Sequence, residues 1–307
     1  MNLVTLPASL DERYFEPMVR DLAASDEDRV LFDATHVRFA DPYGMIGLLT
    51  LGSVARQRGV MPLLKLPESG DVISYLTRMD FFDHAEDIFE INGVRSRGKS
   101  DGVSEVLLEI TPIHSHADVH RIVDVVNERA LDILNKQLNY PRSEAFQFSV
   151  ILSEVCQNII EHAEATGWVA TQTYNWAKKV GRKVVVIAVM DLGIGFRASL
   201  AAAHAARYSR WDDAAALEAA FMHGQTRFHD PGRGQGLQQI RKMVGRWDGR
   251  ISIRSGSARI ADIPSWDEGA PLQENLPSLP GSQIGIVLPA RVPAEAAPAP
   301  FAARGGR

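Results

Sequence analysis

The longest uninterrupted apolar run of the chain, VVVIAVM at residues 184–190, constrains the fold more than any other feature. It is far shorter than the roughly 20 residues that a membrane-spanning helix needs. Its β-branched composition instead predicts a strand buried in a core. A β-rich stretch at residues 168–177 is close enough in sequence to pair with it as a hairpin. The chain therefore builds a sheet that other elements must cover.

Short strands and amphipathic helices alternate through the first part of the sequence. Strands are expected at residues 29–34, 60–67 and 103–112, and helices at residues 45–59 and 70–82. This alternation is typical of an α/β layer, in which helices pack on a mixed or parallel sheet. The polar, glycine-rich residues 92–102 predict a loop or a boundary.

The rest of the chain combines longer amphipathic helices with further strands. Helices are expected at residues 116–138 and 143–166 and after Gly236, and strands at residues 168–177, 182–191, 249–256 and 282–290. Residues 257–280 contain four prolines and are expected to form a loop. The predicted organisation is a first domain at residues 1–112, a connecting helix at 113–140, a second domain at 141–291 and a disordered tail at 292–307.

Composition excludes several classes of protein. A net charge of −5 gives no basic field for nucleic acid or anionic lipid, so neither is an expected partner. One cysteine, Cys156, excludes an internal disulfide framework and a cysteine-based zinc site. The first residues lack the basic start and apolar core of a signal peptide, so we expect a cytoplasmic protein.

Glu154, Asn158 and His162 are the first candidate functional residues, and they are spaced four residues apart. On a helix they line one face, with a drift of about 40° per step. An amide oxygen can ligate a hard cation such as Mg²⁺, and a carboxylate can take a proton from a nucleophile. A solvated helix face shows the same pattern, so the stripe alone does not define a site.

Asp191, Gly193 and Gly195 directly follow the apolar strand. An acid at a strand end can accept a hydrogen bond from an exocyclic amine, and the glycines let backbone come close to a ligand. A plain turn is the simpler alternative. The pattern from Gly193 to Ala198 also matches a dinucleotide-binding fingerprint, with Asp212 or Asp213 as its distal acid, but no βαβ unit begins before the strand.

The third segment is Gly232-Arg233-Gly234-Gln-Gly236-Leu237, which opens a predicted helix. Alternate glycines before a helix expose N–H groups and the positive helix end, which suits phosphate. Arg233 adds a positive charge that either contacts phosphate or is solvated.

Taken together, the order and spacing of these segments resemble the GHKL superfamily of ATP-binding domains, which includes gyrase, MutL, a heat-shock chaperone family and histidine kinases. Glu154, Asn158 and His162 resemble its N box, Asp191, Gly193 and Gly195 its first glycine box, and Gly232, Gly234 and Gly236 its second. The stretch from His223 to Thr226 resembles the end of the ATP lid, expected at residues 196–231, and Gly281-Ser282 resembles the closing strand, where the family usually has Gly-Thr. The resemblance covers about residues 140–290 and implies an α/β-sandwich domain of the Bergerat type.

The resemblance also implies roles for these residues. Asp191 would accept a hydrogen bond from the adenine amino group, assisted by the Ser282 hydroxyl, and Asn158 would ligate the Mg²⁺ that accompanies ATP. Gly232, Gly234, Gly236 and Leu237 would present backbone N–H groups to the phosphates. Glu154 is typical of members that hydrolyse ATP and of the anti-sigma-factor serine kinases, where such an acid serves as a base.

The first domain resembles a STAS domain, the fold of anti-sigma-factor antagonists. That family often carries Asp-Ser-Ser/Thr-Gly before a helix, and its serine is phosphorylated. Here the turn reads Asp41-Pro42-Tyr43-Gly44, with no hydroxyl at the usual serine position. The first domain is therefore expected to be a docking or regulatory module and not the substrate.

The expected protein is thus an α/β, ATP-binding regulator that transfers phosphate to a serine or threonine of a partner, such as an antagonist or a sigma-factor-like protein. Two alternatives stay open: a nucleotide-driven conformational switch, and a histidine-kinase-like module. The latter lacks the family's histidine motif, because His114, His116 and His120 stand in a different context. The helix at residues 116–138 has enough apolar positions either for a homodimer or for packing on its own sheet.

Overall fold

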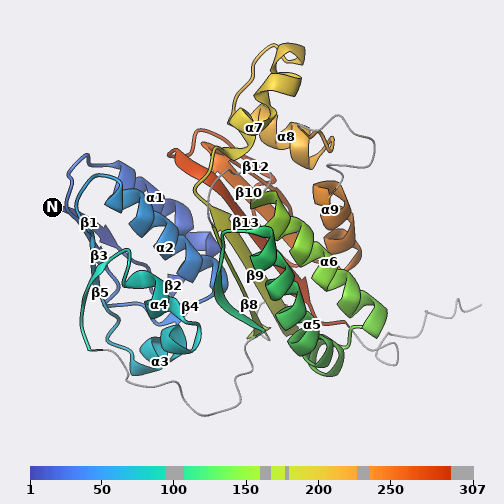
Figure 1. Ribbon diagram of the computed structural model, residues 1–307, viewed down its shortest axis with the longest axis horizontal. Coiled ribbons are helices and arrows are strands. Elements are labelled where there is room, and N and C mark those ends of the chain that lie inside the picture. Colours follow the sequence, from blue (N-terminus) through green and yellow to red (C-terminus); the bar gives the residue numbers. More distant parts are fainter. Residues whose placement is uncertain (95–106, 160–166, 177–179, 227–235, 292–307) are drawn as a thin grey trace, which may run out of the picture.

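The computed structural model describes residues 1–94, 107–159, 167–176, 180–226 and 236–291. The fold is mixed α/β and is built on two main sheets (Figure 1). A four-stranded parallel sheet, in the order β1-β3-β5-β6, belongs to the N-terminal unit, residues 1–94. A seven-stranded antiparallel sheet, in the order β12-β11-β10-β13-β9-β8-β7, belongs to the C-terminal unit, residues 107–291. A short β2-β4 pair completes the N-terminal unit.

Every parallel strand of the N-terminal unit is short. Its strands are β1 (Asn2–Thr5), β2 (Ser9–Leu10), β3 (Val30–Asp33), β4 (Phe39–Ala40), β5 (Leu63–Lys65) and β6 (Glu90–Asn92). Its helices are η1 (Glu12–Tyr14), α1 (Phe15–Ala23), α2 (Pro42–Arg56), α3 (Gly70–Arg78) and α4 (Phe81–Ala85). The Asp41 side chain caps α2 by accepting the Gly44 N–H, and Pro42 occupies the first helical turn, where no N–H is needed.

The seven-stranded sheet has its longest strands at its centre. Its strands are β7 (Leu108–Ile113), β8 (Gly167–Trp176), β9 (Arg182–Asp191), β10 (Arg250–Gly256), β11 (Ala258–Asp262), β12 (Leu272–Gln273) and β13 (Leu279–Pro289). β9 carries the apolar run 184–190 and pairs with β8 and β13. The side chains of this run are buried on both faces of the sheet.

Helices cover both faces of this sheet. α5 (His116–Leu138), α6 (Arg142–Asn158) and α9 (Gly236–Arg246) lie on the inner face and share its apolar core. α2 lies on the other face, called the outer face here, between the two sheets (Figure 1). Ala188 and Met190 of β9 belong to the N-terminal core, and Thr50 of α2 donates to Met190 Sδ at 3.7 Å. The two units are therefore packed through a shared apolar layer.

Glycines allow α2 to pack closely against the rest of the N-terminal unit. A β-carbon on Gly44 would lie 2.0 Å from the Leu10 carbonyl oxygen, and one on Gly52 would lie 2.0 Å from the Phe89 ring. Neither approach is possible for a larger residue. The helix is consequently buried along almost its whole length, from Pro42 to Gly52.

Of two further helices, α7 (Gly195–His204) begins one residue before the predicted lid region 196–231, and α8 (Asp213–Phe221) lies inside it. They project beyond one end of the sheet, at the top of Figure 1. The Asp212 side chain caps α8 by accepting the Ala215 N–H at 2.9 Å. The Ala-rich sequence is thus helical here, as expected from its composition.

Most predicted elements are confirmed, including the α/β alternation, the long helix 116–138 and the hairpin of β8 and β9. The strand expected at residues 103–112 is present as β7, but it pairs with β8 in the second sheet and not with the first. The prediction of a loop at residues 257–280 was wrong, because β11 forms before the first proline of this segment, Pro264, and β12 forms between Pro271 and Pro277. The tail predicted at residues 292–307 lies outside the described residues.

No helix in the described parts of the chain is both long enough and apolar enough to cross a membrane.

Candidate functional site

Asp191 forms the centre of the candidate site at the end of β9. Its carboxylate accepts a hydrogen bond from the Ser282 hydroxyl of β13 and another from the Gly193 N–H at 2.8 Å. The side chain is 2% exposed. Burial raises the pKa of Asp191, and the bonds from Ser282 and Gly193 oppose this rise only in part. The sequence prediction that Asp191 and Ser282 act together is thus consistent with a direct contact.

The backbone around Asp191 depends on glycine at two positions. Gly281 has φ +74°, and a β-carbon there would lie 2.1 Å from the Asp191 carbonyl oxygen. Gly195 has φ +71°, and a β-carbon there would lie 2.7 Å from Ser255 Oγ. Ser255 accepts the Phe196 N–H at 3.1 Å and donates to the Gly281 carbonyl at 2.8 Å. Ser255 therefore joins the two glycine turns, a role that the sequence analysis did not assign to it.

α6 brings Glu154 and Asn158 toward the same end of the sheet. Asn158 is its last residue and is half-buried, and Ile159 follows directly. A β-carbon on Gly167 would lie 2.8 Å from Ile159 Cδ1 and 3.3 Å from Asp191 Cβ, so the end of α6 and the end of β9 meet across Gly167. Asn158 thus directly precedes the residue that packs against Gly167, and Gly167 is the partner of Asp191 in the β8–β9 register.

Glu154 lies one turn earlier on α6 and faces the start of α9. A β-carbon on Gly236 would lie 2.4 Å from Glu154 Oε2, which places the carboxylate against the last glycine of the glycine-rich segment. Leu237 is buried in the core next to this contact. His162, Gly232, Arg233 and Gly234 lie outside the described residues.

The end of the predicted lid is held by specific hydrogen bonds. His204 Nε2 lies 2.8 Å from the Thr226 carbonyl oxygen, which connects α7 to the end of the lid. Gln238 of α9 donates to the Met222 carbonyl at 3.1 Å. A β-carbon on Gly224, at φ +63°, would lie 2.6 Å from the Gln238 side chain. Thr226 thus lies near the start of α9, in the region where the resemblance expects the lid to end.

The described side chains could hold a hard cation such as Mg²⁺ only together with oxygen atoms from a bound ligand. Among the described residues, no group of three or more His, Cys, Asp or Glu side chains could hold a metal ion. Asn158 can offer one amide oxygen, which is a ligand type that Mg²⁺ accepts alongside waters and substrate phosphates. The residues therefore fit Mg²⁺ that arrives with a nucleotide and do not fit a cage made of protein alone.

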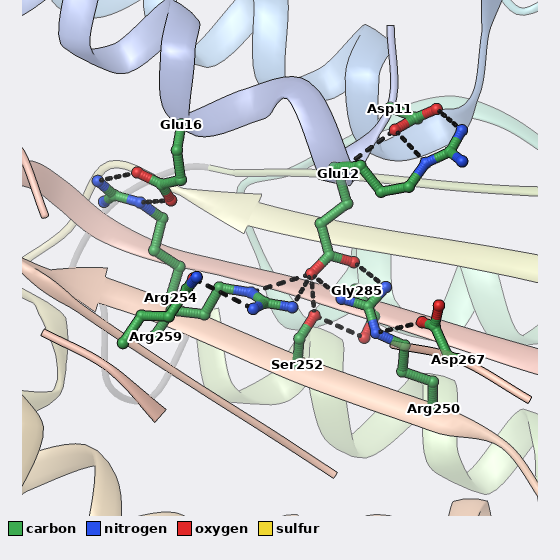
Figure 2. A network of polar contacts seen from close by, with 11 residues as sticks. Asp11, Glu12, Glu16, Arg250, Ser252, Arg254, Arg259, Asp267 and Gly285 are labelled. Atoms are coloured by element: carbon green, nitrogen blue, oxygen red, sulfur yellow. Dashed lines mark hydrogen bonds and ion pairs between the residues drawn. The ribbon is translucent and has the colours of Figure 1, made fainter. Parts of the chain in front are cut away.

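A second polar cluster, absent from the sequence analysis, lies on the outer face of the sheet (Figure 2). Glu12 Oε1 accepts Arg250 Nη2 at 2.7 Å, Arg259 Nη2 at 2.8 Å and Ser252 Oγ at 2.5 Å. A β-carbon on Gly285 would lie 2.8 Å from Glu12 Oε2, so β13 admits this carboxylate only at a glycine. Through these hydrogen bonds, Glu12 connects the N-terminal unit to three residues of β10 and β11.

Glu16 extends this cluster. Its carboxylate accepts Arg254 Nε at 2.7 Å, and Arg254 is only 1% exposed (Figure 2). The next residue of β10 is Ser255, which points to the other face and joins the glycine turns beside Asp191. Neighbouring residues of one strand thus contact the N-terminal unit and the candidate site.

The alternation Arg250-Ile-Ser252-Ile-Arg254 could have pointed to this cluster, because it predicts a strand with one polar and one apolar face. It does not show that the polar face is buried, since its partners lie more than 230 positions earlier in the chain.

The sequence matches no protein-family model and has no significant match among curated proteins.

Proposed function

We propose that the chain is an ATP-binding regulatory protein, in which a GHKL-type domain follows a degenerate STAS-like domain. In this proposal it transfers the γ-phosphoryl group of Mg·ATP to a serine or threonine of a partner protein. The observation that carries the proposal is the approach of Glu154 to Gly236, because it brings the acid of the N box to the glycine segment expected to bind phosphate.

Asp191 is the proposed acceptor for the amino group of adenine. Its carboxylate is buried, and the hydroxyl of Ser282 and the N–H of Gly193 hold it in place. A fixed acceptor of this kind favours a ligand that offers an exocyclic amine, because a carboxylate can accept further hydrogen bonds besides those from Ser282 and Gly193. Asn158 would hold Mg²⁺, which neutralises phosphate charge when bound.

Glu154 would act on the acceptor of the phosphoryl group. A carboxylate beside the phosphate region can take the proton of an attacking hydroxyl, and such a base contributes on the order of 10²–10⁴-fold to the rate. The first turn of α9 would orient the phosphates through the N–H groups of Gly236 and Leu237.

The acceptor belongs to another protein in this proposal. Tyr43, near the position of the STAS phosphoserine, is 2% exposed, and its ring packs edge-on against Phe15 with a centroid distance of 5.4 Å. Gly285 lies against it from the seven-stranded sheet. A hydroxyl held in this interface on the outer face cannot reach a nucleotide bound beside α6 on the inner face.

The test is transfer of label from γ-labelled ATP to candidate antagonist proteins. We expect labelled serine or threonine with the wild type and none with Glu154→Gln, although Glu154→Gln still binds ATP. If the wild type binds ATP but labels no partner, the proposal of a kinase is contradicted. The second candidate function, described next, would then account for ATP binding.

That second candidate is a nucleotide-driven switch, and the contacts at the end of the lid favour it. His204 with Thr226, and Gln238 with Met222, tie α7 and α9 to the segment that would close over a nucleotide. A switch predicts slower amide exchange in residues 196–226 on addition of ATP, without any phosphoprotein. Unchanged exchange with saturating ATP would contradict it.

A further inference from the structure

A cavity of about 400 Å³ lies where the N-terminal unit meets the outer face of the seven-stranded sheet. Asp11, Phe39 and Asp41 line it from one unit, and Trp176 and Val287 line it from the other. Its volume is in the range of sites for small organic molecules. α6 and Glu154 lie on the opposite face of the sheet, so this cavity is separate from the candidate nucleotide site.

One wall of the cavity is apolar and aromatic. Val186 and Val287 pack together with Trp176, and Phe39 packs edge-on against Tyr174 with a centroid distance of 5.4 Å. Such a wall suits a flat or branched hydrocarbon body, and ring faces also attract a cation. The apolar wall thus favours an occupant with an organic body over a bare inorganic ion.

The charged groups of the cavity differ in how they are partnered. Arg13 binds Asp11 through both Nε, at 3.1 Å, and Nη2, at 2.6 Å. Arg250 and Glu12 pair at 2.7 Å. Asp41 differs from these, because within the described residues it forms no ion pair and accepts the Gly44 N–H at 2.8 Å as a helix cap. It is 4% exposed and lines the cavity, so this buried carboxyl group has no cation of the described residues at ion-pair distance.

The geometry points to a binding site for a small organic ammonium ion, with its apolar body against Trp176 and its charged head at Asp41. An ammonium group would supply the cation that Asp41 lacks, and the aromatic wall would remove the body from water. The occupant would contact both units, since Asp41 caps α2 in the N-terminal unit and Trp176 ends β8 in the C-terminal unit. This inference does not depend on the proposed nucleotide site.

The protonation of Asp41 is consistent with this assignment. Burial raises its pKa to about 8, so much of the group is neutral at pH 7. The titratable and charged groups that face it are Asp11, Glu12, Arg13, Tyr75 and Tyr174. An ammonium ion would favour the ionised form, and binding at pH 7 would therefore release protons.

The experiment is calorimetric titration of the full chain with phenethylammonium, without nucleotide, at pH 7 in two buffers of different ionisation enthalpy. We expect one site per chain and a buffer-dependent heat that reports proton release. Asp41→Asn keeps the helix cap, because asparagine caps as well as aspartate. It should weaken binding by at least about tenfold and abolish the proton release.

Two controls make the result specific. Asp33→Asn removes a carboxylate of the same unit that does not line the cavity, and it should bind the probe like the wild type. Phenylacetate has the same ring but an anionic head, and it should not bind. Equal affinity of Asp41→Asn and wild type, equal binding of phenylacetate, or no binding of phenethylammonium at millimolar concentration would each overturn the proposal.

Discussion

The carboxylate of Glu154 lies against Gly236, so close that a β-carbon at position 236 would be 2.4 Å from Glu154 Oε2. This contact joins α6 to the first turn of α9. It explains why position 236, the last of the glycine-rich segment, has no side chain. The same contact gives the first prediction.

Gly236→Ala should displace Glu154 or the first turn of α9, because the new methyl group and the carboxylate cannot occupy the same space. We expect ATP turnover to fall by at least about tenfold, given that a positioned base contributes on the order of 10²–10⁴-fold. Gly245→Ala is the matched control, since it lies on the same helix with nothing within 4 Å. It should leave turnover unchanged and stabilise the helix by about 0.5–1 kcal/mol.

Gly281→Ala should destabilise the protein through two effects, a strained backbone at φ +74° and overlap with the Asp191 carbonyl. Gly181 has nearly the same φ, +73°, but open space around it, so Gly181→Ala isolates the strain. We expect Gly181→Ala to cost about 1–2 kcal/mol and Gly281→Ala to cost at least about 2 kcal/mol more. Urea unfolding measures both, and equal losses would show that the turn beside Asp191 is not tightly packed.

Glu12→Gln should weaken the junction between the two units. Burial alone would raise the pKa of Glu12, but Arg250, Arg259 and Ser252 outweigh it and lower the pKa from 4.5 to about 2. Loss of one partner of a buried ion pair costs about 3–5 kcal/mol, and we expect the lower end because Arg250 keeps Asp267 at 3.2 Å.

The pH dependence of this loss has a definite sign. Because the folded pKa of Glu12 is depressed, its contribution is complete above pH 4.5 and disappears as the pH falls toward 2. The stability difference between wild type and Glu12→Gln should therefore shrink over that interval. Glu68→Gln, at an exposed pair with Arg38, should cost less than about 1 kcal/mol at every pH.

Asp41→Asn should show the opposite pH dependence. Burial raises the folded pKa of Asp41 from 3.8 to about 8, so the neutral form stabilises the fold below pH 3.8 and this contribution is lost as the pH rises toward 8. Asparagine does not titrate. The free energy of unfolding of the variant should therefore rise relative to that of the wild type, by up to about 1.4 kcal/mol per pH unit in that interval. Thermal unfolding between pH 4 and pH 8 measures it, and a constant difference would contradict a buried, unpaired Asp41.

Local sequence patterns correctly predicted the elements whose structure depends on residues close together in the chain. The run 184–190 became a strand buried on both faces, and the period of residues 116–138 became α5 with the same bounds. The contact between Asp191 and Ser282 could also be anticipated, although 91 positions separate the two residues, because the resemblance to the GHKL superfamily implied that they act together.

The rest depends on contacts between distant segments, which periodicity does not report. Ser252 and Arg254 alternate with isoleucines as on a solvated face, yet they are buried against Glu12 and Glu16. β7 follows the N-terminal unit in sequence but pairs with β8, and the alternation of strands and helices does not identify this distant partner.

We propose that Glu154, Asn158 and Asp191 serve one bound Mg·ATP. This is tested by measuring Mg·ATP binding and turnover for the wild type, Asp191→Ala and Glu154→Ala side by side. We expect Asp191→Ala to lose binding, whereas Glu154→Ala should bind ATP without turning it over. Normal binding and normal turnover in both variants would contradict it.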